Sequence, residues 1–205
     1  MNLAISNIAW EKSLDNVMYA EMVRLGITGL EIAPTRLFGS DPYDKLEDAR
    51  IWAVNIKQKF VIPSMQSIWY GMSENIFKNE DERTILLNYT KKAVDFAETI
   101  SCSNLVFGCP KNRNGGRNNM DVAVSFFSEI GQYAVERNVY IGIEAVPKNY
   151  NTDFIVSPMD DGVSFSKNTL TLAPKNEGVT YTLTGYFKGQ VVNKTKNTID
   201  RKSVV

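Results

Sequence analysis

The residues of this chain that could do chemistry are polar or aromatic side chains that each follow a short apolar run. Glu31, Gln66 and Glu144 supply two carboxylates and an amide, and Trp69 supplies an aromatic ring. Carboxylates and amides hydrogen-bond to hydroxyl groups, and aromatic rings offer an apolar face to C–H groups. These types together are typical of a polyol site. The alternative for each carboxylate is a salt-bridged or solvated loop residue, and Glu31 and Gln66 could simply hold strand ends together.

The composition excludes several other chemistries. The 205 residues contain no histidine, which excludes histidine bases, Ser-His-Asp triads and imidazole metal ligands. Lys plus Arg and Asp plus Glu both number 23, so no basic excess indicates binding to nucleic acid or to a membrane. No apolar stretch approaches the roughly 20 residues of a membrane span, and we expect no signal peptide. Two cysteines, Cys102 and Cys109, favour a reducing compartment, and we expect a cytoplasmic protein.

The elements that must position these side chains alternate between two periodicities. Apolar residues recur with helical spacing over 14–25, 46–56, 85–100 and 122–134. Between these segments lie short apolar runs without in-and-out alternation, which indicates buried parallel strands. Right-handed crossovers turn this order into a parallel α/β layer or barrel, whose reactive groups lie at the carboxyl ends of the strands. The five predicted strands are Leu3–Ala9, Gly29–Ile32, Val61–Ser67, Asn104–Gly108 and Val139–Ala145.

The pattern changes from about Val156. Val179, Tyr181 and Leu183 alternate with threonines, which predicts a half-exposed strand, and turn residues separate two further short strands. Residues 156–205 carry seven Lys or Arg against four Asp or Glu. We therefore predict a boundary near Ile155, with an α/β part over 1–155 and a short all-β segment over 156–199, antiparallel or solenoid-like.

Four motifs resemble those of a known family. The chain is similar to the xylose-isomerase-like TIM-barrel superfamily, and most of all to its bacterial sugar phosphate isomerase/epimerase branch. The resemblance covers residues 1–155 and implies a partial (β/α) barrel of about five parallel strands and four helices. The motifs are Gly29-Leu30-Glu31-Ile32-Ala33-Pro34, Ser64-Met65-Gln66-Ser67-Ile68-Trp69-Tyr70-Gly71, Asn104-Leu105-Val106-Phe107-Gly108-Cys109-Pro110 and Gly142-Ile143-Glu144-Ala145.

The resemblance also implies a site. In this superfamily a divalent metal (Mn, Co, Mg or Zn), held by carboxylates and a histidine, polarises a ketose or aldose while glutamates move a proton. Glu144 matches the strand-five glutamate, which is a metal ligand and takes part in proton transfer. Glu31, Gln66 and Trp69 match positions that line the substrate mouth. Lys148 and Asn149 lie in the following loop, where related enzymes contact substrate.

The sequence departs from the family after strand five. The ligands expected from strands six to eight have no counterpart, and a single carboxylate does not hold a catalytic metal tightly. We therefore expect a truncated sugar or sugar-phosphate isomerase/epimerase that is inactive alone and binds its metal weakly. Its partner would be a small sugar or sugar phosphate, with no nucleic acid and no membrane.

Weaker patterns leave alternatives open. Residues 178–191 resemble the start of a bacterial carbohydrate-binding or β-helix module, so the alternative function is non-catalytic carbohydrate binding. The loop Lys111–Arg117 could hold a phosphate or could simply be solvated, and Cys109 could be a nucleophile or a packing residue. An endonuclease relative that shares the barrel ranks lower, because its zinc cluster needs several histidines. Residues 200–205 match one frame of a sequencing adapter, and we expect them to be a scar on a chimeric or truncated gene.

Overall fold

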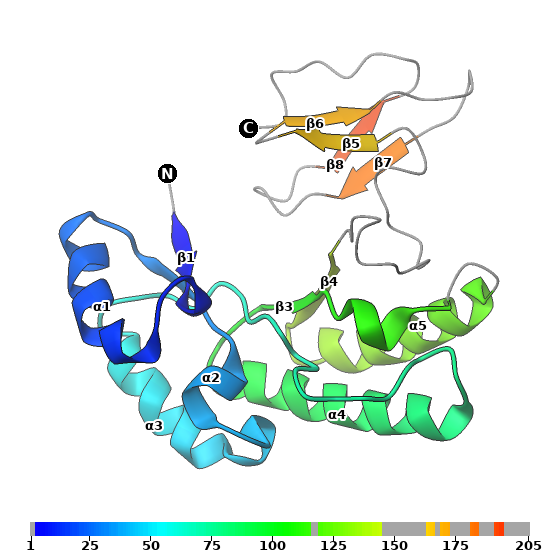
Figure 1. The fold of residues 1–205 in the computed structure, drawn as a ribbon, viewed down its shortest axis with the longest axis horizontal. Coiled ribbons are helices and arrows are strands. Elements are labelled where there is room, and N and C mark those ends of the chain that lie inside the picture. The colour runs from blue at the N-terminus through cyan, green and yellow to red at the C-terminus, as the bar shows by residue number, and fades with distance from the viewer. Residues whose placement is uncertain are drawn as a thin grey trace.

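The computed structural model describes residues 3–115 and 119–144, together with the backbone of four short strands after residue 162. The chain has a mixed α/β architecture (Figure 1). Strand β1 (Ala4–Ser6) pairs in parallel with β2 (Gly29–Glu31), and β3 (Asn104–Phe107) pairs in parallel with β4 (Tyr140–Ile143). This parallel pairing is the one that the apolar runs predicted.

The third predicted strand, Val61–Ser67, differs from the prediction. It forms only isolated parallel bridges, to β2 on one side and to β3 on the other. The Gln66 N–H donates to the Ile32 carbonyl over 2.8 Å, and the Val106 N–H donates to the Met65 carbonyl over 2.8 Å. Pro63 has no N–H to donate, which interrupts a regular ladder. The segment still joins the two strand pairs in the order β1, β2, 61–66, β3, β4.

Four helices lie where the apolar periodicity predicted them: α1 (Asp15–Arg24), α3 (Leu46–Ile56), α4 (Glu80–Thr99) and α5 (Met120–Val135). The start of α4 is fixed by Asn79, whose Oδ1 accepts the Glu82 N–H over 2.8 Å, with three carboxylates in the first turn. The structure adds a short α2 (Pro34–Phe38), and 3-10 turns over Asn7–Ala9, Lys12–Leu14, Pro42–Asp44 and Pro110–Arg113.

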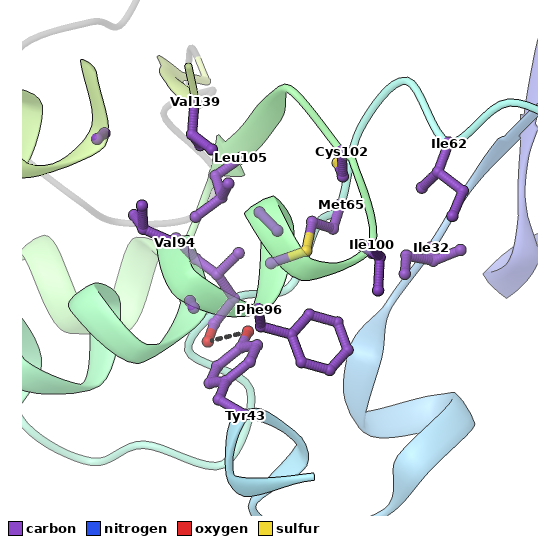
Figure 2. Packing of buried hydrophobic residues seen from close by; sticks show 14 of the residues in the cluster. Ile32, Tyr43, Ile62, Met65, Val94, Phe96, Ile100, Cys102, Leu105 and Val139 are labelled. Carbon is purple, nitrogen blue, oxygen red and sulfur yellow. Dashed lines mark hydrogen bonds between the residues drawn. The ribbon is translucent and has the colours of Figure 1, made fainter. Parts of the chain in front are cut away.

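The hydrophobic core lies between the strands and the helices α3, α4 and α5. Buried side chains of the strand segments, such as Met65 and Leu105, meet Val94 and Phe96 of α4 (Figure 2). Tyr43 packs edge-to-face on Phe96 with 5.5 Å between ring centroids, and its hydroxyl donates to the Ile68 carbonyl over 2.9 Å. The core thus reaches the start of the loop that follows segment 61–66, and fixes it.

Two antiparallel strand pairs follow in the C-terminal part. Strand β5 (Val163–Ser166) pairs with β6 (Thr169–Leu172), and β7 (Tyr181–Thr184) pairs with β8 (Val191–Lys194). The predicted boundary near Ile155 and the suspected scar over 200–205 lie outside the described residues. Within the described part of the chain, every helix is too short or too polar to cross a membrane.

Candidate functional site

Three of the predicted site residues lie at one edge of the strands. Glu31 is the last residue of β2, Gln66 lies at the end of segment 61–66, and Glu144 directly follows β4. Because these strand segments run parallel, their carboxyl ends meet at the same edge. The edge therefore carries the carboxylates and the amide on which a polyol site would depend.

Glu31 and Gln66 belong to one hydrogen-bonded network. The Ser64 Oγ donates to Glu31 Oε2 over 2.6 Å, and Gln66 Nε2 donates to Glu31 Oε1 over 2.9 Å. Gln66 Nε2 also donates to the Ser6 hydroxyl. The four side chains are half-buried, so the network ties three strand ends together while part of its oxygen surface stays open. Both roles that the sequence allowed for Glu31 and Gln66 are compatible with this geometry.

Sequence reasoning missed Ser6 and Ser64 as members of this network. Ser6 is the register partner of Glu31 across β1 and β2, and Ser64 precedes Gln66 by two residues, so both face the same side. That alternation was the available clue. Asn7, another residue at a strand end, is fully buried, and its Oδ1 accepts the Ala33 N–H over 2.9 Å. Asn7 therefore acts as a structural clamp between the ends of β1 and β2.

Glu144 is exposed, and two hydrogen bonds fix its backbone. Its N–H donates to the Phe107 carbonyl over 3.1 Å, and its carbonyl accepts Arg113 Nη2 over 2.7 Å. The carboxylate lies over Gly108, where an added Cβ would approach Glu144 Oε2 to 2.5 Å. A side chain at position 108 would therefore displace the Glu144 carboxylate from this place, which the flexible glutamate side chain allows.

Arg113 belongs to the loop Lys111–Arg117, which the sequence offered as a phosphate site or a solvated loop. The residue is fully buried, and its guanidinium lies 5.8 Å from the Phe107 ring centroid. Burial lowers the pKa of Arg113 to about 10, while the nearby Cys109 and Glu144 favour its charged form. Arg113 therefore carries a positive charge at neutral pH, directly behind the Glu144 backbone.

The donor set at this corner does not fit a divalent metal ion. Among residues 3–115 and 119–144, no three Asp, Glu or Cys side chains come close enough together to share an ion. A tightly held metal needs three or more protein ligands. At this corner the described part of the chain offers the Glu144 carboxylate, with the cationic Arg113 beside it. We therefore derive no chemical step through a metal.

The structure places Trp69 in the core. Its side chain is 2% exposed, Nε1 donates to Thr90 Oγ1 over 2.8 Å, and its ring meets Phe107 edge-on at 4.4 Å between centroids. Protein side chains surround the ring, which does not fit the stacking role expected from the sequence. Tyr70, the next residue, is 72% exposed. The pattern of residue types could not show which of the two neighbouring aromatic rings is exposed.

A cleft of about 580 Å³ opens beside these residues, between the loop after segment 61–66 and the loop after β3. Cys109 lies in its wall, and burial raises the pKa of the Cys109 thiol to about 11. The thiol is neutral at physiological pH, which favours the packing role over the nucleophilic one. The residues lining this cleft are Ser67, Trp69, Tyr70, Gly71, Met72, Cys109, Pro110, Lys111 and Asn112.

Two predicted site residues, Lys148 and Asn149, lie outside the described residues. Their contact with substrate stays a prediction. The same holds for the carbohydrate-binding resemblance of residues 178–191, which the comparisons with known proteins do not support.

The fold is similar to solved structures of sugar isomerases and epimerases. A provisionally named xylose isomerase from Rhodospirillum rubrum is 16% identical, with a TM-score of 0.57 over 79% of this chain and 59% of that one. D-psicose 3-epimerase from Clostridium cellulolyticum is 12% identical, with a TM-score of 0.59 over 79% and 58%. A sugar phosphate isomerase/epimerase from Parabacteroides distasonis is 17% identical, with a TM-score of 0.51 over 69% and 50%.

The chain spans between 50% and 59% of the length of these three proteins. No protein-family model and no curated protein matches the sequence. The similarity nevertheless confirms the predicted α/β class and the likeness to xylose isomerase-like TIM barrels, which are among the solved structures. At these levels of identity it concerns the fold, and the chemistry has to be argued from the site.

Proposed function

We propose that this chain binds a small sugar or sugar phosphate at the carboxyl edge of its strands, as a part of an isomerase or epimerase barrel. The observation that carries the proposal is the network of Glu31, Gln66, Ser6 and Ser64 at that edge, beside an open cleft. Three of the solved structures of the same fold are named as acting on sugars or sugar phosphates, which supports the same class of ligand.

The residues would divide the work between binding and proton transfer. Glu31 and Gln66 already orient each other, so their remaining oxygen lone pairs are placed to accept hydrogen bonds from sugar hydroxyls. Glu144 is exposed at the end of β4, and β3 lies between β4 and segment 61–66. A carboxylate there could take a proton from the carbon beside a sugar carbonyl and return it to the neighbouring carbon. Arg113 would keep Glu144 in place through its backbone carbonyl.

We further propose that the chain alone binds sugar without turning it over. Proton abstraction from a carbon beside a carbonyl needs a positive group on the carbonyl oxygen as the charge develops. The described residues do not assemble a metal site, and the Arg113 guanidinium beside Glu144 is buried under the backbone. We therefore expect this protein to bind sugar and not to convert it.

Saturation-transfer NMR of the full chain with D-psicose and D-tagatose tests the binding. We expect both sugars to bind, and Glu31→Gln to weaken binding about tenfold, because a hydrogen bond to a charged group is lost. The matched control is Glu47→Gln, at an exposed carboxylate in the first turn of α3, which should bind like the wild type. Absence of binding by a correctly folded wild-type chain would contradict the proposal.

Deuterium incorporation from D₂O into the same sugars tests turnover. We expect no exchange at the carbons beside the carbonyl, with or without added Mn²⁺. Steady exchange that disappears in Glu144→Gln would show that the chain is a complete catalyst, and the proposed inactivity would then be wrong.

A further inference from the structure

The cleft beside Tyr70 is built from two loops that hold each other. Asn112 lies in the loop after β3, and its Nδ2 donates to the carbonyls of Met72 at 3.1 Å and Glu74 at 2.8 Å in the other loop. In return, Asn75 Nδ2 donates to the carbonyls of Lys111 at 3.1 Å and Asn114 at 2.9 Å. Asn112 itself is 5% exposed. The walls of the cleft are therefore fixed by hydrogen bonds from side chains of each loop to the backbone of the other.

The groups that this cleft offers to a ligand are of two kinds. Tyr70 is largely exposed and presents an aromatic ring, and Ser67 adds a hydroxyl. Lys111 is exposed and contributes the one charge among the lining residues, which include no carboxylate. Within the described part of the chain, the Lys111 ammonium makes no ion pair, while the Lys111 backbone carbonyl accepts the hydrogen bond from Asn75 Nδ2. The cleft thus combines an apolar face with an uncompensated positive charge.

This combination matches a ligand that has an apolar face at one end and a negative charge at the other. A lysine ammonium binds phosphate as a point charge, and an aromatic ring packs on C–H groups. The strand-end network with Glu31 and Gln66 carries a carboxylate instead, which suits neutral hydroxyl groups and repels phosphate. The two neighbouring regions are therefore complementary to different ends of one molecule.

We propose that the cleft binds the phosphate end of a sugar phosphate, with Lys111 on the phosphate and Tyr70 against the adjoining carbon chain. The inference rests on the proposed sugar-binding function and selects the phosphorylated class of substrate within it. The hydroxyl groups nearer the carbonyl would then lie toward Glu31 and Gln66.

Isothermal titration of the full chain with D-fructose and with D-fructose 6-phosphate tests the assignment. We expect the phosphorylated sugar to bind about tenfold more tightly, and Lys111→Gln to abolish that difference while leaving D-fructose binding unchanged. The preference should also shrink as ionic strength rises, because the ion pair is exposed. Lys59→Gln, in the turn after α3, removes the same charge from an exposed position at the other end of the strands and should change nothing.

Tyr70 gives a second, independent variant. Tyr70→Ala should weaken D-fructose 6-phosphate binding severalfold and Tyr70→Phe should not, since the ring rather than the hydroxyl is proposed to act. Equal binding of the two sugars, or a phosphate preference that survives in Lys111→Gln, would overturn the inference and leave the sugar-binding proposal standing. Binding of inorganic phosphate at Lys111 without binding of either sugar would overturn both, because the cleft would then be an anion site unrelated to sugars.

Discussion

Trp69 and Tyr70 are adjacent in the sequence, yet their rings lie in opposite environments. The difference follows from one hydrogen bond and two ring contacts: the indole N–H of Trp69 reaches Thr90 on α4, and its ring packs on Phe107 and Phe126. Residue type alone predicted an aromatic group at this edge. The tertiary structure decides which ring faces solvent, because it brings Trp69 and not Tyr70 against α4.

Cys102 makes a testable contribution to stability at alkaline pH. The residue is 1% exposed, and burial raises the pKa of its thiol to about 12. An unfolded chain releases this proton near pH 8.5. Between these two pKa values the folded chain keeps the Cys102 proton and the unfolded chain loses it. The contribution of the thiol to the free energy of unfolding is therefore complete below about pH 8.5 and is lost as the pH rises toward 12.

We expect the free energy of unfolding of the wild type to fall more steeply above pH 8.5 than that of Cys102→Ala. The difference in slope should reach about 1.4 kcal/mol per pH unit between the two pKa values. Urea denaturation of both proteins at pH 8 and pH 10.5 measures it, and Tyr43 and the other alkaline groups cancel because both proteins contain them. Parallel pH profiles would show that the Cys102 thiol ionises in the fold as it does in the unfolded chain.

At the level of the elements, the close approach of β1 and β2 depends on Gly29. A Cβ at this position would lie 2.6 Å from the Ala4 Cβ and 2.9 Å from the Leu3 carbonyl oxygen. The Gly29 N–H donates to that same carbonyl over 3.0 Å. A methyl group would therefore push apart the strands that carry Ser6 and Glu31.

We expect Gly29→Ala to lower the free energy of unfolding by about 1–3 kcal/mol, as overpacking of a rigid site does. Gly131→Ala is the matched control, because Gly131 lies inside α5 with nothing within 4 Å of an added Cβ. That substitution should be neutral or stabilise by up to about 1 kcal/mol, since alanine favours a helix. Thermal or urea unfolding measures both, and equal effects at the two positions would contradict the role of Gly29.

The order of helices and strands was predictable because periodicity is a local property. The stripes of α4 and α5 and the apolar runs of β3 and β4 were predicted close to their bounds in the structure. Val61–Ser67 was assigned as a strand on its apolar residues, and the missing N–H of Pro63 reduced it to bridges. Only part of the site could be predicted from the sequence. Strand ends located Glu31, Gln66 and Glu144, whereas the position of Arg113 and the Asn75 and Asn112 bonds depend on which loops meet.

For the whole molecule, the donor set at Glu144 predicts how the protein responds to metals. A ligand that binds only the folded state raises the melting temperature, and the rise grows with the logarithm of the ratio of ligand concentration to Kd. We expect millimolar Mn²⁺ or Co²⁺, and likewise removal of metal with EDTA, to leave the melting temperature of the full chain unchanged within about 1 °C, because the described residues do not gather three ligands. Differential scanning calorimetry measures this.

A rise of several degrees with Mn²⁺ that is absent in Glu144→Gln would contradict that expectation. It would mean that residues beyond those described here complete a metal site around Glu144. Glu47→Gln again serves as the charge-matched control, and should respond like the wild type.

The mutual bonds of Asn75 and Asn112 have a consequence for the energetics of recognition. Loops that must be ordered by a ligand consume part of its affinity as conformational entropy. Here Ile76 also donates its N–H to the Asn112 carbonyl over 2.9 Å, so the two loops are preorganised before any ligand arrives. Association should therefore be fast and should carry a small entropic penalty. A single truncation at Asn75, which does not line the cleft, should slow association although it removes none of the groups lining the cleft.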